Sequence, residues 1–198
     1  MAYETITTAK EGPAFIITFN RPEKRNAIST VVMDEMMHAA AAAEADDEVR
    51  GIIVTGGEKF FSAGADLNDA QALSSPGETH AYMRRWHRLC RSFEENAKAV
   101  IAAVEGFCMT GGCEFALACD LRIAAEDSSF AITSARIGTV AGAGGTQRLP
   151  RIVGTARALE IMLAAEPIDA DAAYRFGLVD ELTPKGGALA RAKEIVDL

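Results

Sequence analysis

Residues 99–125 read AVIAAVEGFCMTGGCEFALACDLRIAA, and this stretch decides the fold. Two short apolar runs, at 99–104 and 121–125, flank a glycine-rich junction and an apolar helical stretch over 111–119. Short apolar runs of this kind are typical of strands buried on both faces, which occur mainly in parallel sheets. The segment therefore predicts a strand, a helix and a second, parallel strand.

The same alternation of strands and helices continues on both sides of this segment. Upstream we predict a hairpin over 3–8 and 14–19, a helix over 30–45 capped by Ser29, a strand at 51–55, a loop over 56–75 and a helix over 78–96. Downstream we predict a glycine-rich segment at 138–145, helices over 156–165 and 170–176, a strand at 178–182 and a final helix. The pattern predicts an α/β fold with a largely parallel sheet.

No linker, repeat or low-complexity segment divides the chain, so we expect residues 1–198 to form a single domain. The last helix reaches Leu198 without a glycine or proline to end it, and we expect the natural protein to continue further.

Composition excludes several classes of protein. The 198 residues include 28 acidic and 20 basic side chains, for a net charge of −8, and 49% of them are hydrophobic. This balance excludes intrinsic disorder and the broad basic surface that nonspecific nucleic-acid binding requires. The longest apolar runs are far shorter than the roughly 20 residues that span a bilayer, so we expect a cytoplasmic protein with no membrane partner.

The cysteines and histidines do not predict a metal site. The four cysteines form no C-x-x-C pair and the three histidines show no ligand spacing, so we expect reduced core thiols and no bound metal.

Two glycine-rich junctions that follow strands carry the candidate chemistry. In the first, FFSAGADL at 60–67, the small residues around Gly64 allow a ligand close to the backbone, where the N–H of Ala65 can donate to an oxygen. The alternative is a tight strand-to-helix turn capped by Asp66.

In the second junction, GFCMTGGCE at 106–114, Gly111 and Gly112 open a helix with Glu114 in its first turn. The helix dipole there favours the ionised carboxylate, which suits a base, although a glutamate that simply completes a cap is the alternative. Together the two junctions predict two N–H donors for one oxygen beside a carboxylate, which is an oxyanion hole with a general base.

Other motifs are weaker. The segment GAGGTQRLP at 142–150 lacks the lysine of a phosphate loop, and we interpret it as a packed loop that opens a helix. The basic series Arg84, Arg85, Arg88 and Arg91 predicts a solvated or subunit-facing helix surface. Three cations at 21–25 suit an anionic ligand, although solvation explains them equally well.

These junctions resemble the enoyl-CoA hydratase/isomerase (crotonase) family. The resemblance rests on four segments in order: NRPEKRNA at 20–27, FSAGADL at 61–67, GGCEFALACDLRIA at 111–124 and GTVAGAGGTQRL at 138–149. It extends to 172–182 and so covers nearly the whole chain. The resemblance implies a crotonase-like spiral of ββα units that binds acyl-CoA thioesters and assembles as a homotrimer or a dimer of trimers. It implies no cofactor beyond the coenzyme A of the substrate, and the family's C-terminal helices are expected to be incomplete here.

The resemblance also assigns residues. It places the N–H groups of Ala65 and Gly111 in the oxyanion hole and makes Glu114 catalytic. The residues implied to contact the substrate or its coenzyme A are Lys24, Arg25, Ala27, Ala63, Gly64, Asp66, Leu67 and Gly112.

One position departs from the family pattern. Family hydratases use a second glutamate, and alignment from Gly138 places Ser134 at that position. Because a hydroxyl is a poor acid, Glu114 would act as both base and acid, with Ser134 or water returning the proton. We therefore predict an enoyl-CoA hydratase. An isomerase that uses one glutamate and a noncatalytic acyl-CoA binder are the alternatives.

Overall fold

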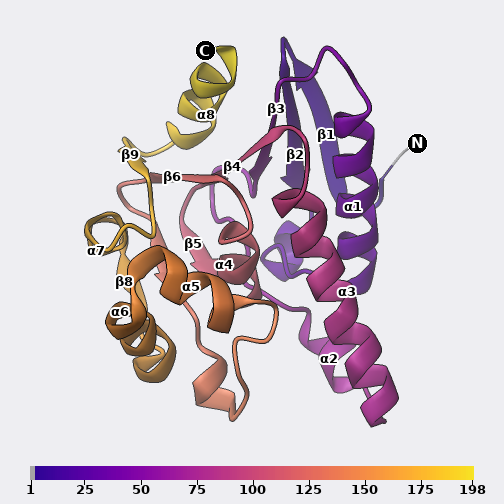
Figure 1. Ribbon diagram of the computed structural model, residues 1–198, viewed down its shortest axis with the longest axis vertical. Helices are drawn as coiled ribbons and strands as arrows, with labels where there is room; N and C mark the ends of the chain where they lie inside the picture. The colour runs from indigo at the N-terminus through magenta and orange to yellow at the C-terminus, as the bar shows by residue number, and fades with distance from the viewer. Residues whose placement is uncertain (1–2) are drawn as a thin grey trace.

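A six-stranded sheet forms the body of the protein in the computed structural model, which describes residues 3–198 (Figure 1). The strand order is β1-β2-β3-β4-β6-β9, and every neighbouring pair is parallel except the β1–β2 hairpin. The strands are β1 (Ile6–Glu11), β2 (Ala14–Phe19), β3 (Gly51–Thr55), β4 (Ala99–Val104), β6 (Leu121–Ala125) and β9 (Glu181–Thr183). The predicted α/β class with a largely parallel sheet is confirmed.

Helices cover both faces of this sheet, as the apolar strands require. Side chains alternate across β3, where Ile52 and Val54 join the larger core while Ile53 joins a smaller core beneath α8 (Ala188–Asp197). On the other face, α1 (Thr30–Glu44) packs against α3 (Pro76–Glu94), as Figure 1 shows. Ser29 caps α1 as predicted, since its Oγ accepts from the Val32 N–H at 3.3 Å.

A second, three-stranded sheet of order β5-β7-β8 was not predicted from the sequence. Its strands are β5 (Phe107–Met109), β7 (Ser129–Ala131) and β8 (Ile168–Asp169). Strands this short are below the length at which an alternating pattern can be recognised. With this sheet in place the chain repeats a ββα unit: β4, β5 and α4 (Gly111–Ala116), then β6, β7 and the 3₁₀ turn η2 (Ser134–Ile137).

Glycine permits the sharp bend between the two sheets in the first of these units. Gly106, between β4 and β5, has a φ of +60°, and a Cβ there would lie 2.1 Å from the carbonyl oxygen of Lys59. No other residue fits such a position.

Several predicted boundaries were wrong. The strand expected at 3–8 starts at Ile6, because the N–H groups of Glu4 and Thr5 bond the carboxylate of Glu35 at 2.6 and 2.8 Å instead of a neighbouring strand. The helix expected over 111–119 ends at Ala116, where hydrogen bonding changes to a three-residue spacing. A short helix, α2 (Leu67–Gln71), lies inside the predicted loop at 56–75. In place of the strand expected at 178–182, the structure has the shorter strand β9 (Glu181–Thr183).

The remaining helical segments lie near their predicted places. They are α5 (Gly145–Val153), α6 (Thr155–Leu159), the π-helical turn η3 (Glu160–Ala164) and α7 (Ala170–Arg175). The 3₁₀ turn η1 (Pro22–Lys24) was not predicted. Cys90, Cys108, Cys113 and Cys119 are all buried free thiols, which confirms the cysteine prediction. Over residues 3–198 no helix has both the length and the apolar character required to cross a bilayer.

Candidate active site

Three loops meet at the carboxyl side of the sheet, and two of them are bonded to each other through Asn26, a residue that the sequence analysis did not single out. Asn26 is only 2% exposed. Its Nδ2 donates to the carbonyl oxygens of Gly56 and Phe61 at 3.0 and 3.1 Å, and its Oδ1 accepts from the N–H of Arg21 at 3.1 Å. Asn26 therefore ties the loop before α1 to the loop after β3.

Ser62 adds the third loop. Its Oγ donates to the carbonyl oxygen of Asn26 at 2.7 Å and accepts from the N–H of Gly64 at 3.1 Å. Its carbonyl oxygen accepts from the N–H of Met109 in β5 at 2.9 Å. All three loops are thus held by buried hydrogen bonds, which fixes the backbone on either side of Gly64 and before Gly111.

This framework brings the main chains at Ala65 and Gly111 together. Gly64 has a φ of +101°, and a Cβ on it would lie 2.9 Å from the nitrogen of Gly111. A Cβ on Gly111 would lie 3.1 Å from the nitrogen of Ala65. Both glycines are required by this close approach of two backbones.

The N–H groups of Ala65 and Gly111 have no acceptor within residues 3–198. Gly111 is the first residue of α4, where an N–H has no intrahelical partner. On either side of Ala65, the carbonyl of Gly64 accepts from the N–H of Ile28, and the N–H of Asp66 donates to the carbonyl of Ile28. Neither bond involves the N–H of Ala65. Two adjacent N–H donors are therefore available to a ligand oxygen, as an oxyanion hole requires.

Glu114 lies in the first turn of α4 and is 3% exposed. Its Oε2 accepts from the N–H of Gly145, the first residue of α5, at 2.9 Å. Burial raises the pKa of Glu114 from 4.5 to about 7, although the N–H groups of Ala143, Gly144 and Gly145 partly oppose the rise. Such a carboxyl group accepts and releases protons near neutral pH, as a general acid or base does.

Gly145 is a second site residue that the sequence analysis missed, because it interpreted 142–150 only as a loop that opens a helix. That interpretation is confirmed by α5, which starts at Gly145. A Cβ on Gly145 would lie 2.8 Å from the Cβ of Ala141 and 3.0 Å from Cγ of Glu114, so glycine leaves the room in which the carboxylate approaches the backbone. If Glu114 only capped α4, its carboxylate would bond the N–H groups of that helix, whereas it bonds the N–H of Gly145 in α5.

Ser134, the predicted replacement for a second acid, is 5% exposed and begins η2. The preceding Thr133 connects this segment to the junction before α4, since its Oγ1 lies 2.8 Å from Oγ1 of Thr110. Ser134 is therefore anchored to the same junction that supplies Gly111.

Asp66 has the capping role that was considered for it. Its Oδ1 accepts from the N–H of Asn68 at 3.0 Å in α2, and its Oδ2 lies 2.8 Å from Nη1 of Arg21. Burial raises the pKa of Asp66, but the bonds from Arg21 and Asn68 outweigh burial and hold the pKa below its usual value.

The other residues predicted to contact coenzyme A form two groups. Lys24, Arg25 and Leu67 are exposed, and Ala27 and Ala63 are half-buried beside them. The two loops that carry them are joined, since the N–H of Ala63 donates to the carbonyl of Arg25 at 3.0 Å. Gly112 is different, because a Cβ on it would lie 2.7 Å from the Cβ of Ser62, which makes it an interior packing position.

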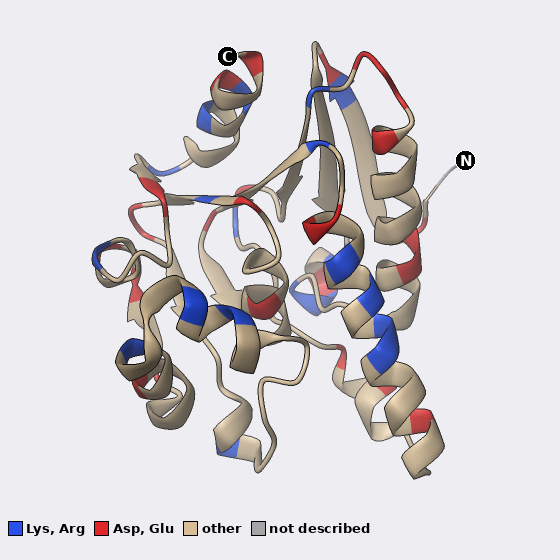
Figure 2. Cartoon of the chain, viewed as in Figure 1, with Lys and Arg blue, Asp and Glu red and all other residues tan. Residues whose placement is uncertain are grey.

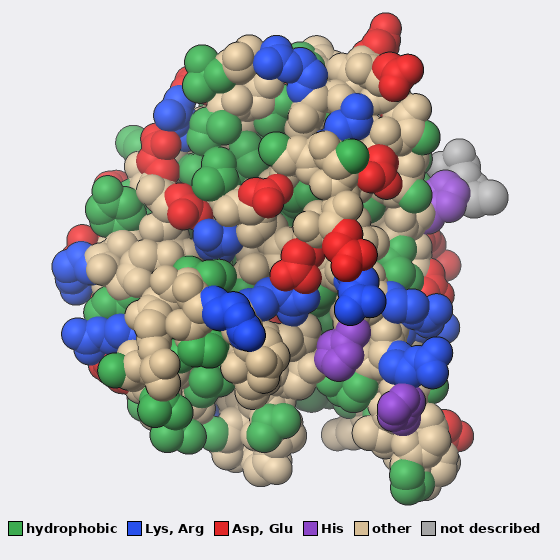
Figure 3. Space-filling view, viewed as in Figure 1, with side chains coloured by type: hydrophobic (Ala, Val, Ile, Leu, Met, Phe, Trp, Pro, Cys, Tyr) green, Lys and Arg blue, Asp and Glu red, His purple; other side chains and the backbone are tan. Residues whose placement is uncertain are grey.

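Arg91 of α3 and Arg148 and Arg151 of α5 line a hollow of about 430 Å³. Figure 2 shows the basic positions on these two helices. In the space-filling view they lie beside acidic side chains on the same face (Figure 3). Arg148 pairs with Glu94 at 2.7 Å, and Arg85 with Asp34 at 3.6 Å. Arg84, Arg88 and Arg91 are exposed, as predicted for a solvated helix surface.

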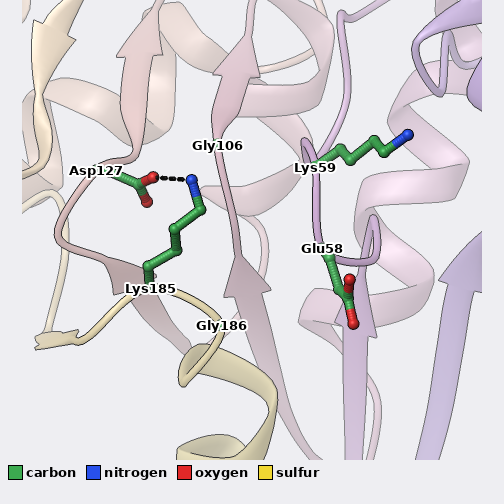
Figure 4. Close-up of a pocket in the computed structure, with 6 residues that line it drawn as sticks. All are labelled: Glu58, Lys59, Gly106, Asp127, Lys185 and Gly186. Carbon is green, nitrogen blue, oxygen red and sulfur yellow. Dashed lines mark ion pairs between the residues drawn. The ribbon is translucent and has the colours of Figure 1, made fainter.

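A second hollow, of about 500 Å³, is separate from the candidate site (Figure 4). Its lining residues are Glu58, Lys59, Gly106, Asp127, Lys185 and Gly186. Lys185 is paired with Asp127 at 2.7 Å, and the lining contains equal numbers of acidic and basic side chains. None of the candidate catalytic residues lines it.

Comparison with known proteins decides the family. The family model described as enoyl-CoA hydratase/isomerase matches residues 10–197. The chain belongs to the enoyl-CoA hydratase/isomerase family. A family member named crotonyl-CoA hydratase, from Syntrophomonas wolfei subsp. wolfei, is 40% identical over 196 residues, which are 98% of this chain and 75% of that protein. A short-chain-enoyl-CoA hydratase from Clostridium acetobutylicum is 37% identical over 198 residues, or 100% of this chain and 76% of that protein.

Solved structures of the same family share the fold. An enoyl-CoA hydratase from Bacillus anthracis superimposes with a TM-score of 0.93 at 33% identity, covering 98% of this chain and 76% of that one. The resemblance seen in the sequence motifs is therefore confirmed, and with it the crotonase-like fold.

The Asn26 bonds provide the first prediction. Asn26→Ala leaves the carbonyls of Gly56 and Phe61 without their donor, and we expect the free energy of unfolding to fall by about 2–4 kcal/mol. Chemical denaturation measures this change, with Asn20→Ala, at an exposed position six residues earlier, as the control. Equal stabilities of the two variants would contradict the bonding role of Asn26.

The second prediction follows from the raised pKa of Glu114. Because the folded protein holds this proton more tightly than the unfolded chain, the group's contribution to stability is complete below pH 4.5 and is lost as pH rises through about 7. The loss amounts to about 3 kcal/mol, since each pH unit between the two pKa values counts roughly 1.4 kcal/mol.

Glu114→Gln lacks this titration. We expect the stability of the wild type, measured relative to this variant by urea denaturation, to fall between pH 4.5 and 8. Parallel stability curves for the two proteins would show that Glu114 titrates at its ordinary pKa.

Proposed function

We propose that this protein is an enoyl-CoA hydratase, a lyase that adds water across the 2,3 double bond of an enoyl-CoA thioester. The observation that carries the proposal is the position of Glu114 on α4. Its carboxyl group has a pKa of about 7, and the first N–H of the same helix, that of Gly111, lies close to the N–H of Ala65. A proton-transferring group and an oxyanion hole are the two devices that addition to a conjugated thioester requires.

In the proposed reaction Glu114 takes a proton from water as the water oxygen bonds to C3. The electron pair of the double bond moves toward C2 and the carbonyl, so negative charge develops on the thioester oxygen. The N–H groups of Ala65 and Gly111 stabilise this charge, and one such donor is typically worth roughly 2.7–4 kcal/mol. Ser134, a water molecule or the protonated Glu114 then delivers a proton to C2, which completes the addition of one H and one OH.

The coenzyme A part of the substrate is proposed to lie along the two joined loops at 21–28 and 61–67. Lys24 and Arg25 are exposed cations on an otherwise acidic protein and suit phosphate groups. Asp66 is already engaged by Arg21 and the cap of α2, so its part is to hold the loop that carries Ala65 rather than to bind the ligand through its carboxylate.

Assembly as a homotrimer or a dimer of trimers stays a prediction from the family resemblance. A cytoplasmic location stays a prediction from the composition. A single domain over 1–198 stays a prediction from the length of the chain, and its binding of acyl-CoA one from the resemblance. Light scattering on the purified protein tests the assembly directly.

A double-bond isomerase is the second candidate. It is favoured by the single carboxylate assigned to the reaction, since one base is enough to take a proton from C2 of a 3-enoyl thioester and return it to C4, which moves the double bond from C3–C4 to C2–C3. A noncatalytic acyl-CoA binder is the third, and it follows from the serine at 134.

Product analysis in heavy-oxygen water separates these functions. The protein is incubated with a short 2-enoyl-CoA and, separately, with its 3-enoyl isomer, and the products are identified by mass spectrometry. We expect a labelled 3-hydroxyacyl-CoA from the 2-enoyl substrate. Unlabelled rearrangement of the 3-enoyl substrate alone would instead establish an isomerase, and binding without any product would establish a binder.

The same assay tests the role of Glu114. Glu114→Gln is expected to lower the rate by roughly 10²–10⁴-fold, because it removes the proton-transferring group. The matched control is Glu58→Gln, at an exposed glutamate of the separate hollow, which is expected to keep the wild-type rate. Equal rates for both variants would remove Glu114 from the mechanism.

A further inference from the structure

The backbone at Thr110 is in a conformation that is costly for a β-branched residue. Its φ is +48° and its ψ is −115°, whereas side chains branched at Cβ strongly disfavour positive φ. Residues in such regions persist only where the surrounding structure holds them, and they cluster at functional sites. Thr110 directly precedes Gly111, the second donor of the proposed oxyanion hole.

Three hydrogen bonds hold Thr110. Its carbonyl oxygen accepts from the N–H of Glu114 in α4 at 2.8 Å. The other two bonds join it to one neighbouring segment. Its N–H donates to the carbonyl oxygen of Ala131 in β7 at 2.7 Å. Its Oγ1 lies 2.8 Å from Oγ1 of Thr133, two residues further along. Both hydroxyl groups are on half-buried residues, so the bond between them is shielded from full competition with water.

The torsion held in this way sets the direction of one donor. Rotation about ψ of a residue turns the peptide plane that follows it, and that plane carries the N–H of the next residue. The ψ of Thr110 therefore sets the direction of the Gly111 N–H relative to the neighbouring N–H of Ala65.

We propose that the Thr110–Thr133 hydroxyl pair is a positioning clamp that keeps the Gly111 N–H aimed at the thioester oxygen. The proposal rests on the hydratase function proposed above. Neither threonine is assigned a proton transfer or a bond to the substrate. Their role is to hold a strained backbone whose relaxation turns an oxyanion-hole donor away.

A clamp of this kind acts mainly on the transition state. The charge on the thioester oxygen is greatest as the C–O bond forms, so a misdirected donor costs more there than in the bound substrate. Loss of the clamp is therefore expected to lower kcat and to leave KM nearly unchanged.

The kinetic test compares Thr133→Val, which keeps the shape but loses the hydroxyl, with Thr133→Ser, which retains it. We expect kcat to fall by about 10–100-fold in the valine variant, with KM changed less than about twofold. The fall is smaller than the roughly 10²–10³-fold loss typical of removing a donor, because the Gly111 N–H is turned and not removed. The serine variant is expected to restore most of kcat.

The matched control is Thr183→Val. Thr183 is a buried threonine whose Oγ1 likewise makes one hydrogen bond, in this case to the carbonyl oxygen of Ala124 in the large sheet. A comparable loss of kcat in Thr133→Val and Thr183→Val, or an unchanged kcat in Thr133→Val, would overturn the clamp.

A readout that needs no activity is the crystal structure of Thr133→Val. We expect Thr110 to leave its positive φ there and the Gly111 N–H to turn. A Thr110 that keeps its φ near +48° would overturn the proposal. If the wild type hydrates no enoyl-CoA, the proposed function fails, while this structure still decides the clamp.

If Thr133→Val does not fold, Thr110→Gly replaces it, because glycine adopts this conformation without strain. Thr110→Gly and the double variant Thr110→Gly with Thr133→Ala, which removes the Thr133 hydroxyl, are expected to share the same kcat, since the hydroxyl partner at position 110 is already gone. A further loss on changing Thr133 in that background would show that Thr133 acts other than through Thr110.

Discussion

The close approach of two backbone N–H groups that have no acceptor within residues 3–198 is the constraint on which the rest of the site depends. Buried N–H groups are nearly always paired, so a fold that leaves those of Ala65 and Gly111 open must hold them by bonds made elsewhere. Asn26 and Ser62 supply these bonds. Both are buried polar side chains whose hydrogen bonds go to backbone groups of the neighbouring loops. Glycine is required at positions 64 and 111, where the two backbone segments approach each other most closely.

Glu114 introduces a second, electrostatic constraint. Its burial opposes ionisation, whereas the N–H groups at the start of α5 favour it, and the balance leaves a pKa of about 7. A more exposed carboxyl would be fully ionised at neutral pH and a weaker base, and one without the N–H groups would stay protonated. The start of α4 thus supplies one of the two open N–H groups, and the start of α5 supplies the N–H that bonds the carboxylate of Glu114.

The sequence predicted the elements that are long or strongly patterned. The parallel strands, α1 with its Ser29 cap, and the two junctions that carry Ala65 and Glu114 were found because apolar runs and glycines mark them. It did not predict β5, β7 and β8, whose three or two residues carry no periodicity. Nor did it find Asn26, Gly145 or Thr110, because each matters through a partner more than 20 residues away, and a single sequence does not show such contacts.

The most direct test of the oxyanion hole is the infrared stretch of a thioester carbonyl in the site. Butanoyl-CoA is saturated and is not hydrated, so its complex with the protein does not turn over. With ¹³C at the carbonyl, the stretching frequency of the bound C=O can be measured by isotope-edited difference spectroscopy. Hydrogen bonds from both Ala65 and Gly111 weaken the C=O bond, and the account predicts a lower stretching frequency in the complex than in water. A bound carbonyl whose frequency equals or exceeds that in water would contradict it.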